Sequence, residues 1–231
     1  MARSGEVVEN PKIGDRVTWR KTARETHGEL LRYELVVWPA AKGPLAHIHP
    51  RQEERFEVLS GTLRARVKDR EQTLSVGQSL VVAPGTPHTW WNDGHDEAHV
   101  LVEFRPALHF ETILETGYGL ARDGKTDEKG VPNPLQLGVM FNEYRDEIYL
   151  AALPIAAQKV LWALLGNIGK LLGYEARYPR YSGPEPEGEE ATRPHSGSGG
   201  RTEAVAAGLL IAVLALYLLL ARRQRRSSSG R

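Results

Sequence analysis

Short runs of alternating apolar and polar residues fill the chain from Asp15 to about Arg105. They are rich in β-branched residues and separated by Gly, Pro, Asn and Asp, which is typical of an all-β sandwich or barrel. Two runs meet at Ser60 and Gly61, where glycine allows the positive φ of a tight hairpin. The pattern predicts strands over residues 15–21, 30–38, 55–61, 61–69, 79–84 and 97–105.

Alternation is clearest in the last of these runs, residues 97–105. Since successive side chains of a strand point to opposite faces, one face of this strand is expected in the core. That face carries Ala98, Val100, Val102 and Phe104. The opposite face carries His99, Leu101, Glu103 and Arg105, and it is expected to contact water or a cavity.

The periodicity changes after Pro106 and predicts helices over residues 109–124, 135–150 and about 155–172. The third helix is amphipathic, with Lys159, Asn167 and Lys170 opposite its apolar face. That face contains Val160, Leu161, Leu164, Leu165, Ile168, Leu171 and Leu172. Two interpretations stay open: the helix docks on the folded domain, or it lies in a membrane interface.

The composition changes again near residue 182. Residues 182–203 are poor in apolar residues and rich in Gly, Pro, Ser and Glu, so a disordered linker is expected. Residues 204–221 then run without a charge. As a helix they would extend roughly 27 Å, close to a bilayer core of about 30 Å, and they predict a transmembrane helix. An arginine-rich tail, residues 222–231, follows.

Two rules disagree about the orientation of this anchor. More arginines follow the span than precede it, which favours a cytoplasmic C-terminus and a folded domain outside. The polar N-terminus lacks the apolar run of a secretory signal peptide, which favours a folded domain that stays inside. We expect a single-pass membrane protein with a C-terminal anchor and a cytoplasmic folded domain.

The amino-acid composition limits the kinds of functional site that the chain can form. The absence of cysteine excludes disulfides, thiolate zinc sites, iron–sulfur clusters and a cysteine nucleophile, and leaves His, Asp and Glu as metal ligands. The formal net charge is only +1, and five arginines lie in the C-terminal tail. No nucleic-acid partner is predicted from this balance.

Four residues stand out as candidate metal ligands. His47 and His49 are two positions apart, so both imidazoles project from one face of a strand. After a turn at Pro50, an antiparallel return brings Glu54 to the same place, and His88 follows a second strand and a Pro-Gly turn. Three imidazoles and one carboxylate suit borderline divalent metals.

These residues resemble the two motifs of the cupin superfamily. The first, G-x5-H-x-H-x3or4-E-x6-G, is matched by His47, His49, Glu54 and Gly61, and the second, G-x5-P-x-G-x2-H-x3-N, by Gly77, Gly85, His88 and Asn92. Two positions depart from the motifs. Ala41 stands at the first glycine, with Gly43 nearby, and Ala83 stands at the proline, followed by Pro84. Both positions shape turns and neither is a ligand.

The resemblance implies an all-β core, a cupin-type jelly-roll β-barrel, followed by α-helices and the transmembrane helix. The expected division is an N-terminal arm (1–24), the barrel (25–107), a helical extension (108–181), the linker, the anchor and the tail. The resemblance further implies one divalent metal ion, Fe, Mn, Ni, Cu or Zn, on His47, His49, Glu54 and His88. By strand alternation, Phe56, Trp90 and Asn92 are candidates for the surrounding pocket.

The resemblance also suggests a function. A small organic substrate would bind in the barrel, and the favoured activity is a metal-dependent oxidoreductase of the dioxygenase type, with isomerase or lyase activity as family alternatives. A binding or sensing module tethered to the membrane is the other hypothesis, and a metal-free barrel is a third. For residues 108–181, capping of the barrel, homodimerisation and membrane contact stay open.

Overall fold

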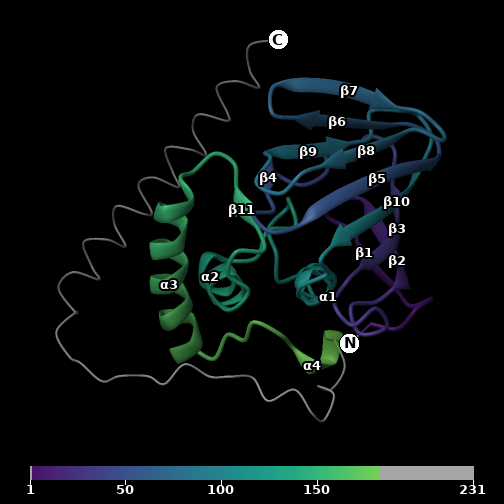
Figure 1. Ribbon diagram of the computed structural model, residues 1–231. Coiled ribbons are helices and arrows are strands. Elements are labelled where there is room, and N and C mark those ends of the chain that lie inside the picture. Colours follow the sequence, from purple (N-terminus) through teal and green to yellow (C-terminus); the bar gives the residue numbers. More distant parts are fainter. Residues whose placement is uncertain (1, 183–231) are drawn as a thin grey trace. The chain divides into compact units, whose positions relative to one another are not determined.

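The computed structural model describes residues 2–182, and these form a sandwich of two antiparallel sheets followed by helices (Figure 1). The larger sheet has the strand order β1-β2-β3-β10-β5-β8 and the smaller one β11-β4-β9-β6-β7. The strands of the larger sheet are β1 Val7–Asn10, β2 Asp15–Lys21, β3 Leu31–Val37, β5 Glu53–Ser60, β8 Ser79–Val82 and β10 Ala98–Arg105. The strands of the smaller sheet are β4 His47–Ile48, β6 Leu63–Val67, β7 Arg70–Leu74, β9 His88–Trp91 and β11 Tyr149–Leu150. This arrangement is the jelly roll that the sequence predicts.

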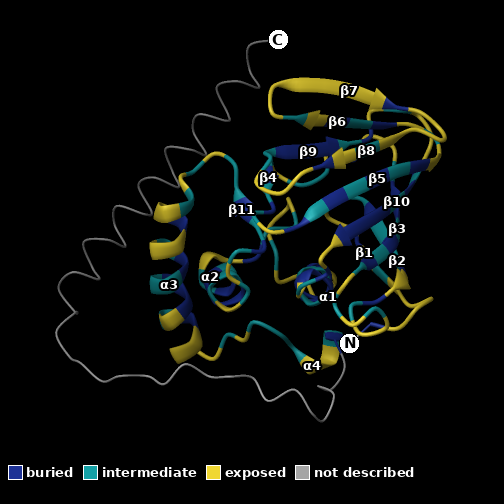
Figure 2. Cartoon of the chain, viewed as in Figure 1, coloured by how far each residue is buried: buried dark blue, intermediate teal, exposed yellow. Residues whose placement is uncertain are grey.

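The core lies between the two sheets, as Figure 2 shows by the buried residues of the strands. β10 confirms the predicted alternation in part: Ala98, Val100, Val102 and Phe104 are fully buried and Arg105 is exposed. Glu103, expected on the wet face, is buried in an ion pair with Arg32. Neighbouring strands supply the matching rows, because Tyr33 and Phe56 both pair with Val102. One face of the large sheet is therefore a continuous apolar wall.

Residues 1–24, expected to form an arm, contribute two strands to the large sheet. β1 pairs with β2, and β2 pairs with β3 over Asp15 to Lys21. Trp19 in β2 is fully buried and makes an edge-to-face contact with Tyr33. The β2 strand thus belongs to the core.

Two glycines permit close approaches that hold the sandwich together. Gly43 has φ +62°, and a Cβ there would overlap the carbonyl oxygen of Trp90. Gly61, φ +71°, turns the predicted hairpin, and a Cβ there would overlap the carbonyl oxygen of Glu97. Gly43 lies two residues after the motif position held by Ala41, so the loop keeps a glycine where the backbone needs it.

The extension contains helices α1 (Phe110–Arg122), α2 (Pro134–Glu143), α3 (Ile155–Leu171) and α4 (Pro179–Ser182). The second predicted helix, residues 135–150, ends earlier than expected. Tyr144 caps α2, and residues Tyr149–Leu150 form β11, which pairs with β4. The apolar residues near position 148 therefore belong to a strand. Over so short a run, hydrophobic periodicity does not distinguish a strand from a helix.

The buried face of α3 differs from the predicted apolar face. Trp162 and Leu165 pack toward α2 with Gly166 and Gly169, whereas Val160 and Leu171 are 63% and 86% exposed (Figure 2). The glycines let the backbones of α2 and α3 approach closely. This close contact, more than the number of apolar side chains, determines which face of α3 is buried.

Within residues 2–182, no helix combines the length and apolar character needed to span a membrane. The predicted linker, nearly all of which follows residue 182, the anchor at 204–221 and the arginine-rich tail lie outside the described residues.

Candidate metal centre

The structure brings the four predicted ligands together. One ligand atom from each of His47, His49, Glu54 and His88 lies within 4.8 Å of every other, and all four residues are buried. His47 and His88 are direct partners in the β4–β9 ladder, and His49 follows β4 by one residue. Glu54 reaches the cluster from β5 in the other sheet. Both sheets therefore supply ligands.

The local backbone explains this convergence. Alternation along the strand puts His47 and His49 on one face, with their rings 4.9 Å apart. The chain turns directly afterwards, and the His49 carbonyl accepts a hydrogen bond from the Gly85 amide at 2.8 Å. This bond ties the first motif to the Pro-Gly turn that precedes His88.

The three imidazoles are held in the orientation that metal binding needs. In each ring Nδ1 lies within hydrogen-bond distance of a backbone carbonyl: Leu45 at 2.8 Å for His47, Glu147 at 2.7 Å for His49 and Thr86 at 3.0 Å for His88. An Nδ1–H that donates to a carbonyl leaves Nε2 as a free lone pair. The three Nε2 atoms are thereby available as ligands.

The pKa values of the three histidines are shifted in different directions. Burial lowers the pKa of His47 well below its usual value and also lowers the pKa of His49, so both rings are neutral near pH 7. For His88, burial is the largest effect and opposes protonation, but the hydrogen bond and negative charge of Glu54, together with the Thr86 carbonyl, outweigh it and raise the pKa. His88 Nε2 lies 2.6 Å from Glu54 Oε2, as an ion pair would.

The residues fit a divalent cation. His49 Nε2 is buried and has no hydrogen-bond partner, and it lies 3.7 Å from Glu54 Oε2. A buried polar atom without a partner is costly unless a further group satisfies it. Neutral imidazoles and one carboxylate are the donor set of Fe, Mn, Ni, Cu and Zn. The cluster is consistent with a single metal ion.

Aromatic side chains enclose one side of the cluster. Phe104 of β10 and Phe110 of α1 both make edge-to-face contacts with the His49 ring, each with a centroid distance of 5.0 Å. Their own rings lie 4.2 Å apart. α1 thus inserts an apolar residue beside a candidate ligand and excludes water from that side.

The three predicted pocket residues have different places. Phe56 is buried in the core, 1% exposed, and Trp90 is 8% exposed. Asn92 is occupied by a turn: Nδ2 donates to the carbonyls of Val37 and Asp96, and Oδ1 accepts from the Gly94 amide. Its side chain therefore shapes the loop after β9.

Three residues around the cluster were not identified from the sequence. Gln52 donates from Nε2 to the carbonyls of Pro106 and Ala107, and its buried Oε1 has no hydrogen-bond partner. Glu147 supplies the carbonyl that orients His49 and binds His109 through its carboxylate. No motif spacing links these positions, because Gln52 and His49 contact backbone carbonyls, which any residue provides, and His109 and Glu147 are 38 positions apart.

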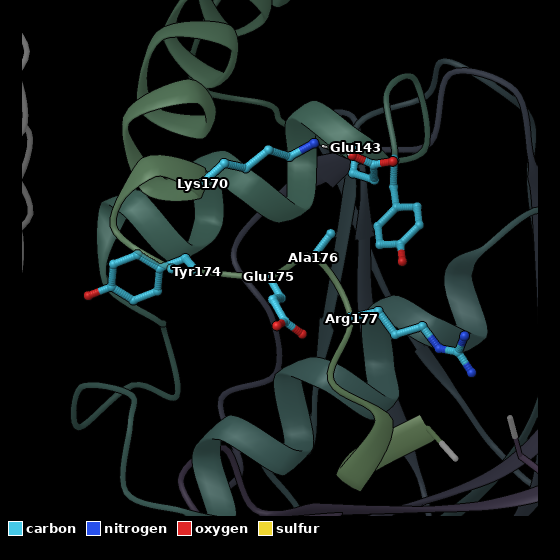
Figure 3. Close-up of a pocket in the computed structure, with 8 residues that line it drawn as sticks. Glu143, Lys170, Tyr174, Glu175, Ala176 and Arg177 are labelled. Atoms are coloured by element: carbon cyan, nitrogen blue, oxygen red, sulfur yellow. Dashed lines mark hydrogen bonds and ion pairs between the residues drawn. The ribbon is translucent and has the colours of Figure 1, made fainter. Parts of the chain in front are cut away.

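A separate hollow of about 500 Å³ lies at the C-terminal ends of α2 and α3 (Figure 3). Lys170 and Glu143 form an ion pair on its wall, with Nζ and Oε2 2.6 Å apart. It shares none of the four candidate ligands.

Comparisons with known proteins give one family match and distant relatives. Residues 33–104 match the Cupin_2 family, described as a cupin domain. An oxidoreductase from Arthrobotrys oligospora is 27% identical over 157 residues. The match covers 62% of this chain and 61% of the relative, so it spans less than two thirds of that protein's length.

Two solved structures match a smaller share of this chain than this relative does. A predicted oxalate decarboxylase from Thermotoga maritima is 17% identical, with a TM-score of 0.40, over 46% of this chain and 98% of that protein. A sugar phosphate isomerase of the cupin superfamily from Silicibacter pomeroyi is 21% identical, with a TM-score of 0.37, over 42% and 62%.

Proposed function

We propose that the protein is a metal-dependent oxidoreductase, similar to dioxygenases, that acts on a small organic substrate at His47, His49, Glu54 and His88. The observation that carries the proposal is the buried convergence of these four ligands, with Nδ1 of each imidazole directed to a carbonyl. The distant oxidoreductase relative supports the choice of reaction class.

The ion would be Fe, Mn, Ni, Cu or Zn, and four protein ligands leave coordination positions open on a five- or six-coordinate metal. When bound, the metal supplies Lewis acidity and, for redox-active ions, electron transfer. The protein's own contribution is to orient three imidazoles through carbonyls at Nδ1 and to bring the Glu54 carboxylate beside His88 and His49. Phe104 and Phe110 pack on the His49 ring and exclude water from that side.

A non-catalytic barrel that binds or senses a small ligand is the second candidate. The observation that favours it is the short contact between His88 Nε2 and Glu54 Oε2, which satisfies two of the four groups without an ion. The two candidates differ in turnover and share the same pocket.

Elemental analysis of the full-length protein, purified without a histidine tag, tests the site. We expect about one equivalent of metal in the parent protein and in His99→Ala, a control at a histidine on the outer face of β10. His49→Ala and Glu54→Ala should each lose it. Metal retained in both ligand variants would refute the site.

An oxygen-consumption assay then separates the two candidates. The metal-loaded protein is supplied with flavonols, catechols and oxalate. Turnover that is lost in Glu54→Ala supports the oxidoreductase, whereas saturable binding without turnover supports the binding module.

We propose further that residues 204–221 anchor the domain to a membrane as a single helix, with the folded domain on the cytoplasmic side. The support is the uncharged apolar run, which ends at a group of arginines. Leu214→Arg places a charge at the centre of the run, at a cost of roughly 2.5–3.5 kcal/mol. This variant should float less with vesicles than the parent does, and Ser228→Arg should not differ. Protease protection of the domain in intact cells tests the orientation.

A further inference from the structure

One of the three candidate histidine ligands is oriented by a distant part of the chain. His47 and His88 direct Nδ1 to carbonyls two residues earlier, at Leu45 and Thr86. His49 directs Nδ1 to the carbonyl of Glu147, 98 residues later, in the helical extension. The Nε2 lone pair of His49 is therefore fixed by an element outside the two motifs.

The Glu147 carbonyl is held in place by its own side chain. Glu147 is 2% exposed, and its carboxylate accepts the His109 amide at 2.9 Å and 3.1 Å. His109 Nδ1 lies 2.7 Å from Glu147 Oε1. His109 immediately precedes α1, whose first residue, Phe110, packs on the His49 ring. One carboxylate thus connects the extension, α1 and the candidate ligand.

The strand that follows Glu147 is also clamped onto the ligand strand. β11 pairs with β4, with Leu150 opposite His47, and the Ala151 amide donates to the Ala46 carbonyl at 2.9 Å. Gln158 of α3 closes the other side of β11. Its side chain accepts from the Leu150 amide and donates to the carbonyls of Leu150 and Leu153.

We propose that Glu147 is a positioning residue for the metal centre: its carboxylate, through His109, places the backbone carbonyl that fixes the tautomer and direction of His49. The inference rests on the proposed metal site. It assigns the helical extension a part in metal binding, since without the extension His49 lacks the acceptor that the other two histidines find two residues earlier in the chain.

The physical effect is on the free energy of metal binding. An Nδ1–H with no acceptor competes with the Nε2–H tautomer, and the ring gains freedom to rotate, so part of the binding energy is spent on ordering it. Removal of partners of this kind typically weakens metal affinity about 10- to 100-fold.

The test compares Glu147→Ala, Glu147→Gln and a matched control, Gln136→Ala. Gln136 is 1% exposed and lies in the same extension, but its side chain binds the Glu175 carbonyl and the Tyr178 hydroxyl, away from β4. Its loss should cost comparable stability without reaching His49. Metal affinity is measured by chelator competition with Zn²⁺, and stability of the metal-free proteins by urea unfolding.

We expect Glu147→Ala to weaken Zn²⁺ binding about 10- to 100-fold. Glu147→Gln should lose less, because one carboxamide oxygen still accepts the His109 amide. Gln136→Ala should bind as the parent does. Unchanged affinity in Glu147→Ala, or an equal loss in Gln136→Ala, would overturn the assignment and leave Glu147 with a structural role only.

A second readout needs no metal. In the metal-free parent, long-range ¹H–¹⁵N correlation spectra should show the His49 proton on Nδ1, and in Glu147→Ala a mixture of the two tautomers. An unchanged His49 signal in the variant overturns the inference even if the parent binds no metal. Absence of metal binding in the parent, with the tautomer shift present, would instead count against the proposed function alone.

Discussion

Gln52 connects the ligand region to the start of α1. Its carboxamide is 1% exposed and donates both Nε2 protons, to the Pro106 and Ala107 carbonyls at 3.1 Å and 3.0 Å. These bonds fix which end of the amide is oxygen, since only nitrogen donates to two carbonyls. Oε1 is left buried without a hydrogen-bond partner.

Gln52→Leu keeps the volume of the side chain and removes both donors. The buried Ala107 carbonyl and the exposed Pro106 residue's carbonyl then lose their donor, and the free energy of unfolding should fall by about 1–3 kcal/mol. Urea denaturation measures the loss. Gln72→Leu, on the exposed strand β7, is the control and should stay within about 0.5 kcal/mol of the parent. An equal effect at the two positions would contradict the role of these bonds.

Asp15 is a buried carboxyl at the start of β2. Tyr118 of α1 donates to its Oδ2 at 2.9 Å, whereas Oδ1 has no partner. Burial raises the pKa of Asp15 to about 7, against the opposing effect of the Tyr118 hydrogen bond. The folded protein therefore holds a proton that the unfolded chain releases near pH 4.

This linkage predicts that Asp15 makes the protein less stable as the pH rises from about 4 to 7. In that window the folded state binds more protons, so the free energy of unfolding falls, by at most about 4 kcal/mol. Asp15→Asn removes the effect. The melting temperature of the variant, relative to the parent, should rise between pH 5 and pH 8. A constant difference across that range would contradict the raised pKa.

At the residue scale, the sequence predicts the four ligands because their spacing places them on strands of known periodicity. It does not identify Glu147 or His109, because a backbone carbonyl carries no residue type and the contact spans 98 positions. Asn92 illustrates the reverse case. Strand alternation predicts it as a pocket residue, but its amide is fully occupied by hydrogen bonds in the turn after β9.

Among the elements, α2 and α3 form a tightly packed pair with its own small core of Tyr149, Trp162 and Leu165. Glycines determine how close they lie. A Cβ at Gly166 would come within 2.7 Å of the Gly138 carbonyl oxygen and 2.9 Å of Asn142 Cβ. The backbones must separate to admit even one methyl group.

Gly166→Ala should therefore destabilise the protein by about 1–3 kcal/mol through overpacking. Gly117→Ala, in the interior of α1, is the matched control. A Cβ there meets nothing within 4 Å, so the higher helix propensity of alanine should stabilise by up to about 1 kcal/mol. Thermal unfolding of the two variants measures the difference. Equal destabilisation by both substitutions would contradict the packing argument.

At this scale the sequence predicts that helices follow the barrel, and it gives α1 and α3 within a few residues. It misplaces the end of α2 and the buried side of α3. Both errors arise from tertiary contacts: β11 finds a partner in β4, and the glycines of α3 select which side faces α2. Neither partner is visible in a local window of sequence.

For the whole molecule, the candidate centre joins the two sheets. His47 and His88 belong to the smaller sheet and Glu54 to the larger one, while the extension reaches the centre through Glu147. A bound ion would therefore resist separation of the sheets as well as occupy a pocket.

The folded protein should consequently gain stability from metal. At a free concentration of one hundred times Kd the gain is about 2.7 kcal/mol. Calorimetry of the parent with and without Zn²⁺ or Mn²⁺ should show a higher melting temperature with metal, and EDTA should reverse it. His49→Ala is the control and should not respond. A parent that melts identically with and without each metal would contradict a site that binds only the folded state.

Glu147 lies late in the chain, so the ribosome adds it after both histidine motifs. A chain made from its N-terminus completes both histidine motifs by residue 92, some fifty residues before the carbonyl that orients His49 has been added. Until β11 pairs with β4, the nascent barrel presents only two of its three imidazoles in a fixed tautomer. Tight binding of an ion at the proposed centre should then require the finished fold, because only the completed extension supplies the carbonyl that orients His49.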